Sequence, residues 1–216
     1  MAKDTRLIKA AKKMKRFGGE LPLVEEISNS KGSIDIYGDQ VYDESLYRND
    51  NIASGISSLD EITDTHVKYY RENGFLAIQN AFTSAQISDA ITGLDNCISG
   101  KYPDYDGIQY ERVKDVDPES LSFDEKKKQI RKLSYFLDHE KLFQSIVADP
   151  QFLSVIKKLI NATPEGHGDQ ALFKPPIIGR EKPWHQDLAF FDLPSGTKII
   201  GCWIALDKAT LENGCM

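Results

Sequence analysis

The spacing of hydrophobic residues changes along this chain, and that change most constrains how it can fold. Between residues 61 and 160, apolar side chains mostly recur at the three- and four-residue spacing of amphipathic helices. After residue 168 they occur in short β-rich runs separated by Pro and Gly: "DQALFKPP", "KPWHQDLAFF" and "TKIIGCWIALDKA". Helices followed by strands indicate an α+β domain with an antiparallel sheet, in a sandwich or a barrel, and helices packed outside it.

Capping residues indicate where the helices begin and end. The segment "DEITDTHVKYYRENGFLAI" predicts a helix that ends at Asn73–Gly74, after which "FLAI" continues as a strand. The segment "TSAQISDAITGLDNCI" predicts a helix capped by Thr83 or Ser84. The segment "EKLFQSIVADPQFLSVIKKLI" predicts two helices broken at Asp149–Pro150. The buried positions expected for the first two of these segments are Ile62, Val67, Tyr70, Ile87, Ala90, Ile91 and Leu94.

The other segments suggest an extension followed by a folded domain. Residues 18–60 are rich in Gly, Ser, Asn and Asp, so we expect residues 1–60 to form a basic arm and an irregular extension. The folded domain is expected over residues 61–216. Polar turn clusters predict a long loop or a poorly ordered insertion over residues 100–127, and such loops often cover active sites. The segment "QIRKLSYFL" that follows has a strand-like composition.

Charge is distributed unevenly along the chain. Residues 1–16 carry seven Lys or Arg and one Asp, whereas the whole chain has a net charge of -6. This basic arm can form a short amphipathic helix that is solvated, packs locally or contacts a membrane surface. The acidic remainder gives no reason to expect nucleic-acid binding. The short basic run "DEKKKQIRK" is expected to be a solvated flank of a loop.

The cysteines and the lack of long apolar runs predict a cytoplasmic location. The three cysteines are scattered and never occur in a CxxC spacing, which argues against a disulfide framework and against a cysteine zinc site. The sequence has no run of about 18 apolar residues that could cross a bilayer. No apolar signal-peptide core follows the basic start. We therefore expect a soluble protein in the reducing cytoplasm.

One short segment, "KPWHQDLAFF", holds the residues best suited to chemistry. On a strand, His185 and Asp187 point the same way and can reach one point in space. An imidazole nitrogen and a carboxylate oxygen suit a divalent metal, and two His with one carboxylate hold Fe(II) in non-haem oxygenases. The alternative is a histidine that hydrogen-bonds its own loop. The second such pair, His167 and Asp169 in "GHGD", is flanked by glycines and predicts a turn.

The context of this segment resembles a known family. The pattern "KPP...G...PWHQDLAFF" followed by "WIALDKATLENGC" is similar to the phytanoyl-CoA dioxygenase family of Fe(II)- and 2-oxoglutarate-dependent oxygenases. The resemblance covers roughly residues 60 to 216 and is strongest from residue 170 onward. It implies a double-stranded β-helix, which is a jelly-roll or cupin-like barrel, with the N-terminal helices packed on one side.

The resemblance also implies roles for individual residues. His185 and Asp187 match the first two iron ligands, and Lys132, Gln170 and Trp203 fall where the family contacts 2-oxoglutarate. The implied reaction uses O2 to hydroxylate an unactivated C–H bond of a small-molecule substrate, with decarboxylation of 2-oxoglutarate to succinate. Related halogenases replace the carboxylate ligand with a small residue, so the presence of Asp187 favours hydroxylation.

Two family residues have no match in this sequence. The second iron-binding His, and the Arg that binds the far carboxylate of 2-oxoglutarate, follow the "ENGC" segment in the family. We therefore expect an incomplete domain that lacks its C-terminal strands and has little or no activity, because an arginine–carboxylate pair and a metal ligand are missing. Exposed barrel edges would favour self-association. The alternatives are a non-catalytic jelly-roll binding protein and another cupin-like metal enzyme, such as an isomerase.

Overall fold

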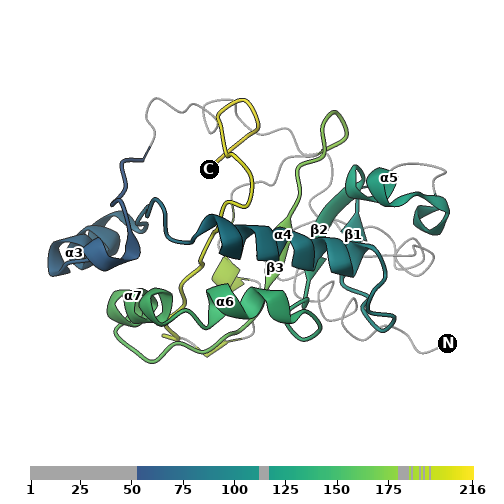
Figure 1. The fold of residues 1–216 in the computed structure, drawn as a ribbon. Helices are drawn as coiled ribbons and strands as arrows, with labels where there is room; N and C mark the ends of the chain where they lie inside the picture. Colours follow the sequence, from purple (N-terminus) through teal and green to yellow (C-terminus); the bar gives the residue numbers. More distant parts are fainter. Residues whose placement is uncertain are drawn as a thin grey trace. The chain divides into compact units, whose positions relative to one another are not determined.

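A computed structural model describes residues 53–111, 117–179, 185, 187–189, 191, 193–194 and 196–216 (Figure 1). The chain divides into two units, and all of these residues belong to the unit formed by Asn49–Arg180 and Trp184–Met216. The other unit, Met1–Arg48 with Glu181–Pro183, lies outside the described residues. The predicted basic arm and most of the predicted extension therefore also lie outside them.

The described residues form helices and one small sheet, so the predicted α+β class is confirmed at this level. The α-helices are α3 (Asp64–Asn73), α4 (Ser84–Ile98), α5 (Phe123–Lys127), α6 (Gln144–Val147) and α7 (Pro150–Ile160). The 3-10 helices are η3 (Leu59–Glu61), η4 (Pro118–Ser120), η5 (Lys141–Phe143) and η6 (Asp187–Ala189). The strands are β1 (Ile108–Tyr110), β2 (Ile130–Ser134) and β3 (Gln170–Leu172).

The helix boundaries follow from the capping residues, as the sequence predicts. Thr83 precedes α4, and its hydroxyl accepts a hydrogen bond of 3.2 Å from the backbone N–H of Gln86. Asp149 caps α7 in the same way at 2.9 Å, with Pro150 in the first turn. Gly74 ends α3 with a φ of 81°, a left-handed conformation that glycine adopts without a steric penalty.

The sheet is antiparallel with the order β1-β2-β3, and it corrects two predictions. The predicted loop over residues 100–127 contains β1 and the short helix α5, so that prediction is wrong in part. The predicted strand "FLAI" is also wrong, because Ile78 forms only an isolated parallel bridge with Ile56. The strands expected in "QIRKLSYFL" and "DQALFKPP" are confirmed as β2 and β3.

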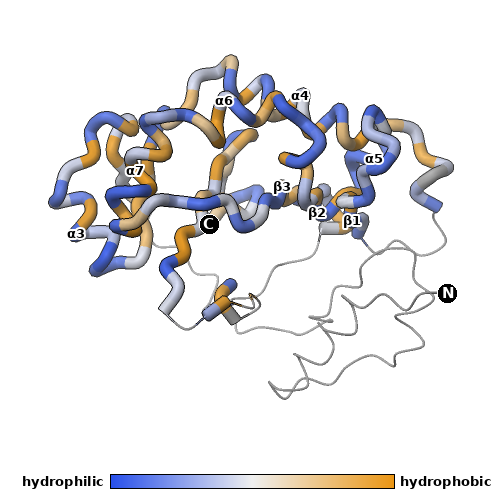
Figure 2. Tube along the Cα trace, turned by 90° about the horizontal axis from the view of Figure 1, so that it is seen from below, coloured by the Kyte–Doolittle hydropathy of each residue, from blue (hydrophilic) through white to orange (hydrophobic). Residues whose placement is uncertain are grey.

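The hydrophobic core consists of two clusters. In Figure 2, hydrophobic and hydrophilic stretches alternate along α3, α4 and α7, as expected for helices that bury one face. The larger cluster joins α4, β2 and the segment around α6, and contains Ala90, Leu94, Cys97, Ile98, Ile130, Leu133, Phe136, Phe143 and Ile146. The smaller cluster joins η3, α3 and α7, and contains Leu59, Val67, Val155 and Leu159.

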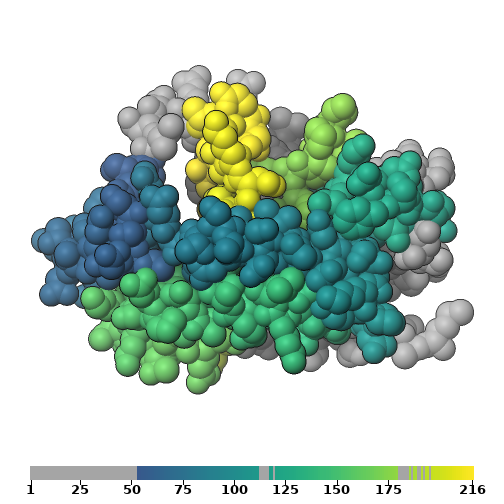
Figure 3. All heavy atoms as spheres, viewed as in Figure 1, coloured from purple at the N-terminus to yellow at the C-terminus, as the bar shows by residue number. Residues whose placement is uncertain are grey.

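The sheet does not close into a barrel within the part of the chain that the structure describes. It has three strands. The predicted strand "TKIIGCWIALDKA" forms no ladder there, although Ile204 and Leu206 pack against the larger cluster. In Figure 3 this C-terminal segment, in yellow, lies beside α4. Alternating hydrophobic residues predict which side chains face inward, but a strand also requires a partner for its backbone hydrogen bonds.

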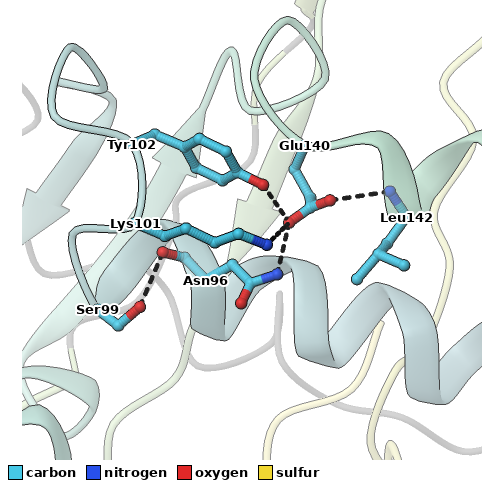
Figure 4. A network of polar contacts seen from close by, with 6 residues as sticks. All are labelled: Asn96, Ser99, Lys101, Tyr102, Glu140 and Leu142. Carbon is cyan, nitrogen blue, oxygen red and sulfur yellow. Dashed lines mark hydrogen bonds and ion pairs between the residues drawn. The ribbon is translucent and has the colours of Figure 1, made fainter.

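A buried carboxylate, Glu140, joins the end of α4 to η5 (Figure 4). Its side chain is 4% exposed and accepts hydrogen bonds from Asn96 Nδ2 at 2.6 Å, Tyr102 Oη at 2.7 Å and the backbone N–H of Leu142 at 3.0 Å. Burial alone would raise the pKa of Glu140, but these hydrogen bonds outweigh it and lower the pKa below the usual 4.5. Donation to Glu140 is also the main reason that the pKa of Tyr102 rises to about 12.

Replacing Glu140 by Gln should destabilise the fold, because the amide cannot accept from all of these donors. We expect a loss of about 1–3 kcal/mol in the free energy of unfolding at pH 7. Because the folded-state pKa is lowered, the stabilisation exists above pH 4.5 and disappears as the pH falls through the folded-state value. Urea unfolding from pH 7 to pH 3 should therefore show the two proteins converging.

The matched control is Glu72→Gln, which removes an exposed carboxylate 3.7 Å from the amine of Lys68. A surface pair of this kind contributes about 0–1 kcal/mol, so this variant should unfold like the wild type at both ends of the pH range. Equal stability of Glu140→Gln and wild type at pH 7 would show that the buried network is not stabilising.

A close approach of α4 to η5 makes a second position sensitive. A Cβ atom added at Gly93 would lie 2.8 Å from Phe143 Cε2 and 2.9 Å from Glu140 Cγ. Replacing Gly by Ala within a helix raises the free energy of unfolding by about 1 kcal/mol. Overpacking a well-packed core lowers it by about 1–3 kcal/mol.

We expect the clash to exceed the helix-propensity gain, because Glu140 is fixed by its hydrogen bonds. Gly93→Ala should therefore lower the free energy of unfolding by about 1 kcal/mol. Thermal unfolding monitored by circular dichroism measures the change. Ser88→Ala, at an exposed position of the same helix, should shift it by less than about 0.5 kcal/mol. A Gly93→Ala protein that is more stable than the wild type would contradict the close packing.

Candidate functional site

His185 and Asp187 lie together at the start of a short helical turn. Asp187 is the first residue of η6, and its backbone carbonyl accepts a hydrogen bond from the N–H of Phe191 at 3.2 Å. The predicted strand is therefore wrong for this part of the segment. The two side chains still meet, with His185 Nε2 3.2 Å from Asp187 Oδ1. They are 27% and 66% exposed, so both can be reached from solvent.

The separation of these two atoms suits neighbouring positions around one metal ion. Imidazole nitrogen and carboxylate oxygen bind such ions at about 2.1 Å, so two ligands at right angles lie about 3.0 Å apart. The observed 3.2 Å is close to this value. The same distance also allows a hydrogen bond from the imidazole to the carboxylate, which is the alternative that the sequence leaves open.

No third donor completes a metal site among the residues that the structure describes. There, no group of three or more His, Cys, Asp and Glu side chains is placed to hold a metal ion. Cys97, which is buried in the larger cluster, is not suited to the task, because burial raises the pKa of its thiol to about 11.

Lys132 and Gln170 lie on one face of the sheet. Lys132 on β2 is paired with Leu172 on β3, and Ser134 is paired with Gln170 two positions along. Residues paired across antiparallel strands point to the same side, and alternate residues of a strand do as well. Leu133, which lies between Lys132 and Ser134, points to the opposite side and is completely buried beneath α4. The two polar residues therefore share the face that does not pack against α4.

Trp203 lies on a different segment, outside the sheet. Its side chain is 50% exposed, while Ile204 beside it packs against the larger cluster. The structure thus brings His185 and Asp187 into contact and places Lys132 and Gln170 on one face of the sheet, whereas Trp203 is a separate, partly exposed residue.

Two further residues near these groups were not predicted from the sequence. Leu172 is 57% exposed on the same sheet face as Lys132, and the period-two spacing of "QAL" could have placed it beside Gln170. The ring of His167 packs edge-on against Phe191, with ring centroids 5.0 Å apart, close to the turn that holds Asp187. No signal in the sequence indicates this contact, because it joins two loops.

The second pair predicted as a turn, in "GHGD", is part of an irregular segment. Asp169 Oδ2 accepts a hydrogen bond of 2.8 Å from the backbone N–H of Leu137. This carboxylate therefore joins the segment before β3 to the segment that follows β2. This contact is a structural role for Asp169.

Helices beside a small antiparallel sheet, with an exposed imidazole–carboxylate pair, are compatible with a metal-dependent enzyme. The family model described as "Phytanoyl-CoA dioxygenase (PhyH)" matches residues 70–216. The chain belongs to this family. The matched range contains all five residues that the sequence analysis expects to bind iron or 2-oxoglutarate. Four of the five lie from residue 170 onward, where the resemblance is strongest. Dioxygenases of this family generally depend on Fe(II) and 2-oxoglutarate.

Several curated proteins are similar to this chain. Mouse (Mus musculus) phytanoyl-CoA dioxygenase domain-containing protein 1 is 26% identical over 72% of this chain and 63% of its own length. Its zebrafish (Danio rerio) counterpart is 26% identical over 73% of this chain and 64% of its own length. Human (Homo sapiens) peroxisomal phytanoyl-CoA dioxygenase is 27% identical over 69% of this chain and 44% of its own length. The chain thus spans less than two thirds of these relatives.

No solved structure matches the chain. Of the helices that the structure describes, none is both long enough and apolar enough to cross a membrane.

The sheet register predicts that neighbouring residues of β2 differ in their contribution to stability. Leu133→Ala should lower the free energy of unfolding by about 2–5 kcal/mol, because it leaves a cavity under α4. Lys132→Ala, one residue away on the opposite face, should change it by less than about 1 kcal/mol. Urea unfolding of both variants measures the difference. A Lys132→Ala protein as unstable as Leu133→Ala would contradict the assignment of the two faces.

Proposed function

We propose that the protein is an Fe(II)- and 2-oxoglutarate-dependent oxygenase that hydroxylates an unactivated C–H bond of a small organic substrate. The observation that carries this proposal is the 3.2 Å separation of His185 Nε2 and Asp187 Oδ1, within the residues that the family model matches. The donor set supports iron, since one imidazole nitrogen and one carboxylate oxygen are two of the three protein ligands of non-haem Fe(II) oxygenases.

His185 and Asp187 would hold the metal ion, and their exposure leaves room for other ligands beside them. When bound, Fe(II) and 2-oxoglutarate supply the means to activate O2, with decarboxylation of 2-oxoglutarate to succinate. A site of this kind needs open positions, because a metal saturated by protein ligands could bind neither oxygen nor co-substrate. The retained carboxylate of Asp187 supports hydroxylation as the outcome.

Lys132, Gln170 and Trp203 would position the co-substrate. The ammonium group of Lys132 can pair with a carboxylate of 2-oxoglutarate, and the amide of Gln170 can donate a hydrogen bond from the same face of the sheet. The exposed indole of Trp203 can cover an apolar part of a ligand. We propose further that this sheet face lines the interior of the family's jelly-roll barrel, since the opposite face packs against α4.

Anaerobic absorption spectroscopy tests the proposal on the protein itself. Fe(II) and 2-oxoglutarate together should give a charge-transfer band, because the band requires a chelated co-substrate. His185→Ala and Asp187→Ala should each weaken the apparent Fe(II) affinity by at least about tenfold. Asp89→Ala, which removes an exposed carboxylate from α4, is the control and should keep the band. An unchanged band in Asp187→Ala would contradict its role as a ligand.

The same experiment addresses a second candidate, a non-catalytic binding protein with the same fold. This candidate is favoured by one observation, that no cluster of three potential ligands occurs among the described residues. It predicts no metal uptake and no band. Metal uptake without the 2-oxoglutarate-dependent band would instead indicate another cupin-like metal enzyme.

A further inference from the structure

A pocket of about 360 Å³ lies between α3 and α7, and none of the candidate iron or 2-oxoglutarate residues lines it. These two helices lie side by side in Figures 1 and 2 and share the smaller hydrophobic cluster. The lining residues are Asp64, Val67, Lys68, Arg71, Lys158 and Asn161. The four from α3 are spaced at i, i+3, i+4 and i+7, so they form one stripe along the helix.

The lining of this pocket is basic, although the chain as a whole has a net charge of -6. Lys68, Arg71 and Lys158 contribute three positive charges against the single carboxylate of Asp64. A fourth cation, Lys198, donates a hydrogen bond of 3.1 Å to the backbone carbonyl of Asn161 in the lining. The pocket is therefore a local positive site on an acidic protein.

Two of these cations have no counter-ion among the described residues. In the part of the chain that the structure describes, neither Arg71 nor Lys158 forms an ion pair. Lys68 lies 3.7 Å from the carboxylate of Glu72, but both side chains are exposed and such a pair is weak. Positive charges that converge without a partner repel one another, so an anion bound among them would be stabilised.

Helix dipoles account for only part of this arrangement. Cations near the C-terminal end of a helix are stabilised by its dipole, which favours Lys158 on α7 and Arg71 on α3. Lys157 occupies the same turn of α7 and gains the same stabilisation, but it does not line the pocket. The dipole therefore does not explain why charges from two separate helices converge on one pocket.

We propose that this pocket binds a phosphate-bearing small molecule. The guanidinium of Arg71 offers a fork of donors, and the ammonium groups of Lys68 and Lys158 act as point charges, a combination that suits phosphate oxygens. The volume is at the lower end of the range for small-molecule sites, which is about 300–1,000 Å³. A concave pocket of this size fits a phosphorylated metabolite better than a membrane surface or a nucleic acid, which need extended basic surfaces.

Asp64 allows a test of whether the ligand is negatively charged. It lies seven residues before Arg71, about 10 Å along the helix, at the opposite end of the stripe. Its carboxylate would oppose an anion in the pocket. Removing this charge should therefore tighten the binding of a phosphate group, whereas removing Arg71 or Lys158 should weaken it.

Isothermal titration calorimetry on the full chain tests this proposal with two probes, inorganic pyrophosphate and ADP. The titrations are run at low ionic strength, because salt screens exposed charges, and with a chelator present so that no metal ion can bind the phosphate. Wild type should bind pyrophosphate. Arg71→Gln with Lys158→Gln should weaken binding by about tenfold or more, and Asp64→Asn should strengthen it by about twofold. Tighter binding of ADP than of pyrophosphate would show that the ligand is a nucleotide.

Lys157→Gln is the matched control, because it removes the same charge from the same helix turn outside the pocket. It should change the affinity by less than about twofold. Circular dichroism checks that each variant is folded, and the single variant Arg71→Gln replaces the double variant if the latter unfolds. Equal weakening by Lys157→Gln, or no measurable binding of either pyrophosphate or ADP, would overturn the proposal. None of these results depends on iron, so they leave the proposed oxygenase function untouched.

Discussion

The packing of α4 and β2 in the larger hydrophobic cluster determines which way the side chains of the sheet point. Leu133 on β2 is completely buried beneath Ala90, Leu94 and Cys97 of the helix. Because side chains alternate along a strand, the burial of Leu133 directs Lys132 to the opposite face. The register with β3 then brings Gln170 and Leu172 to the same face as Lys132. This packing thus decides which face of the sheet carries Lys132, Gln170 and Leu172.

Local patterns in the sequence predict the helices well and the sheet poorly. The boundaries of α4 and α7 follow from Thr83 and Asp149, whose side chains bond to backbone groups three residues away. The strand β1 escapes prediction because it has only three residues in a polar region, and its partner lies about twenty residues further along the chain. Residues 197–208 show the reverse case. Their hydrophobic alternation predicts a strand, but the pattern contains no information about a backbone partner.

The proximity of His185 and Asp187 is predictable from their spacing, but the local backbone conformation is not. The spacing of His185 and Asp187 suggests that they converge, and they do, through the start of a 3-10 turn and not through the pleat of a strand. The outcome is the same because either conformation can bring side chains two residues apart to within a few ångströms. The contact between His167 and Phe191 depends on how two loops pack together, which no local spacing encodes.

A buried ion pair stabilises the register of β1 and β2. Glu111 and Arg131 form a buried ion pair of 2.8 Å where the register of β1 and β2 shifts, and Lys132 follows directly in the chain. No buried side-chain nitrogen or oxygen lacks a hydrogen-bond partner among the described residues. A bulge adds a residue to one strand and changes where the next side chains point, and a buried pair resists slippage because an unpaired buried charge is costly. The buried ion pair of Glu111 and Arg131 thus helps to hold β1 and β2 in register at the position directly before Lys132.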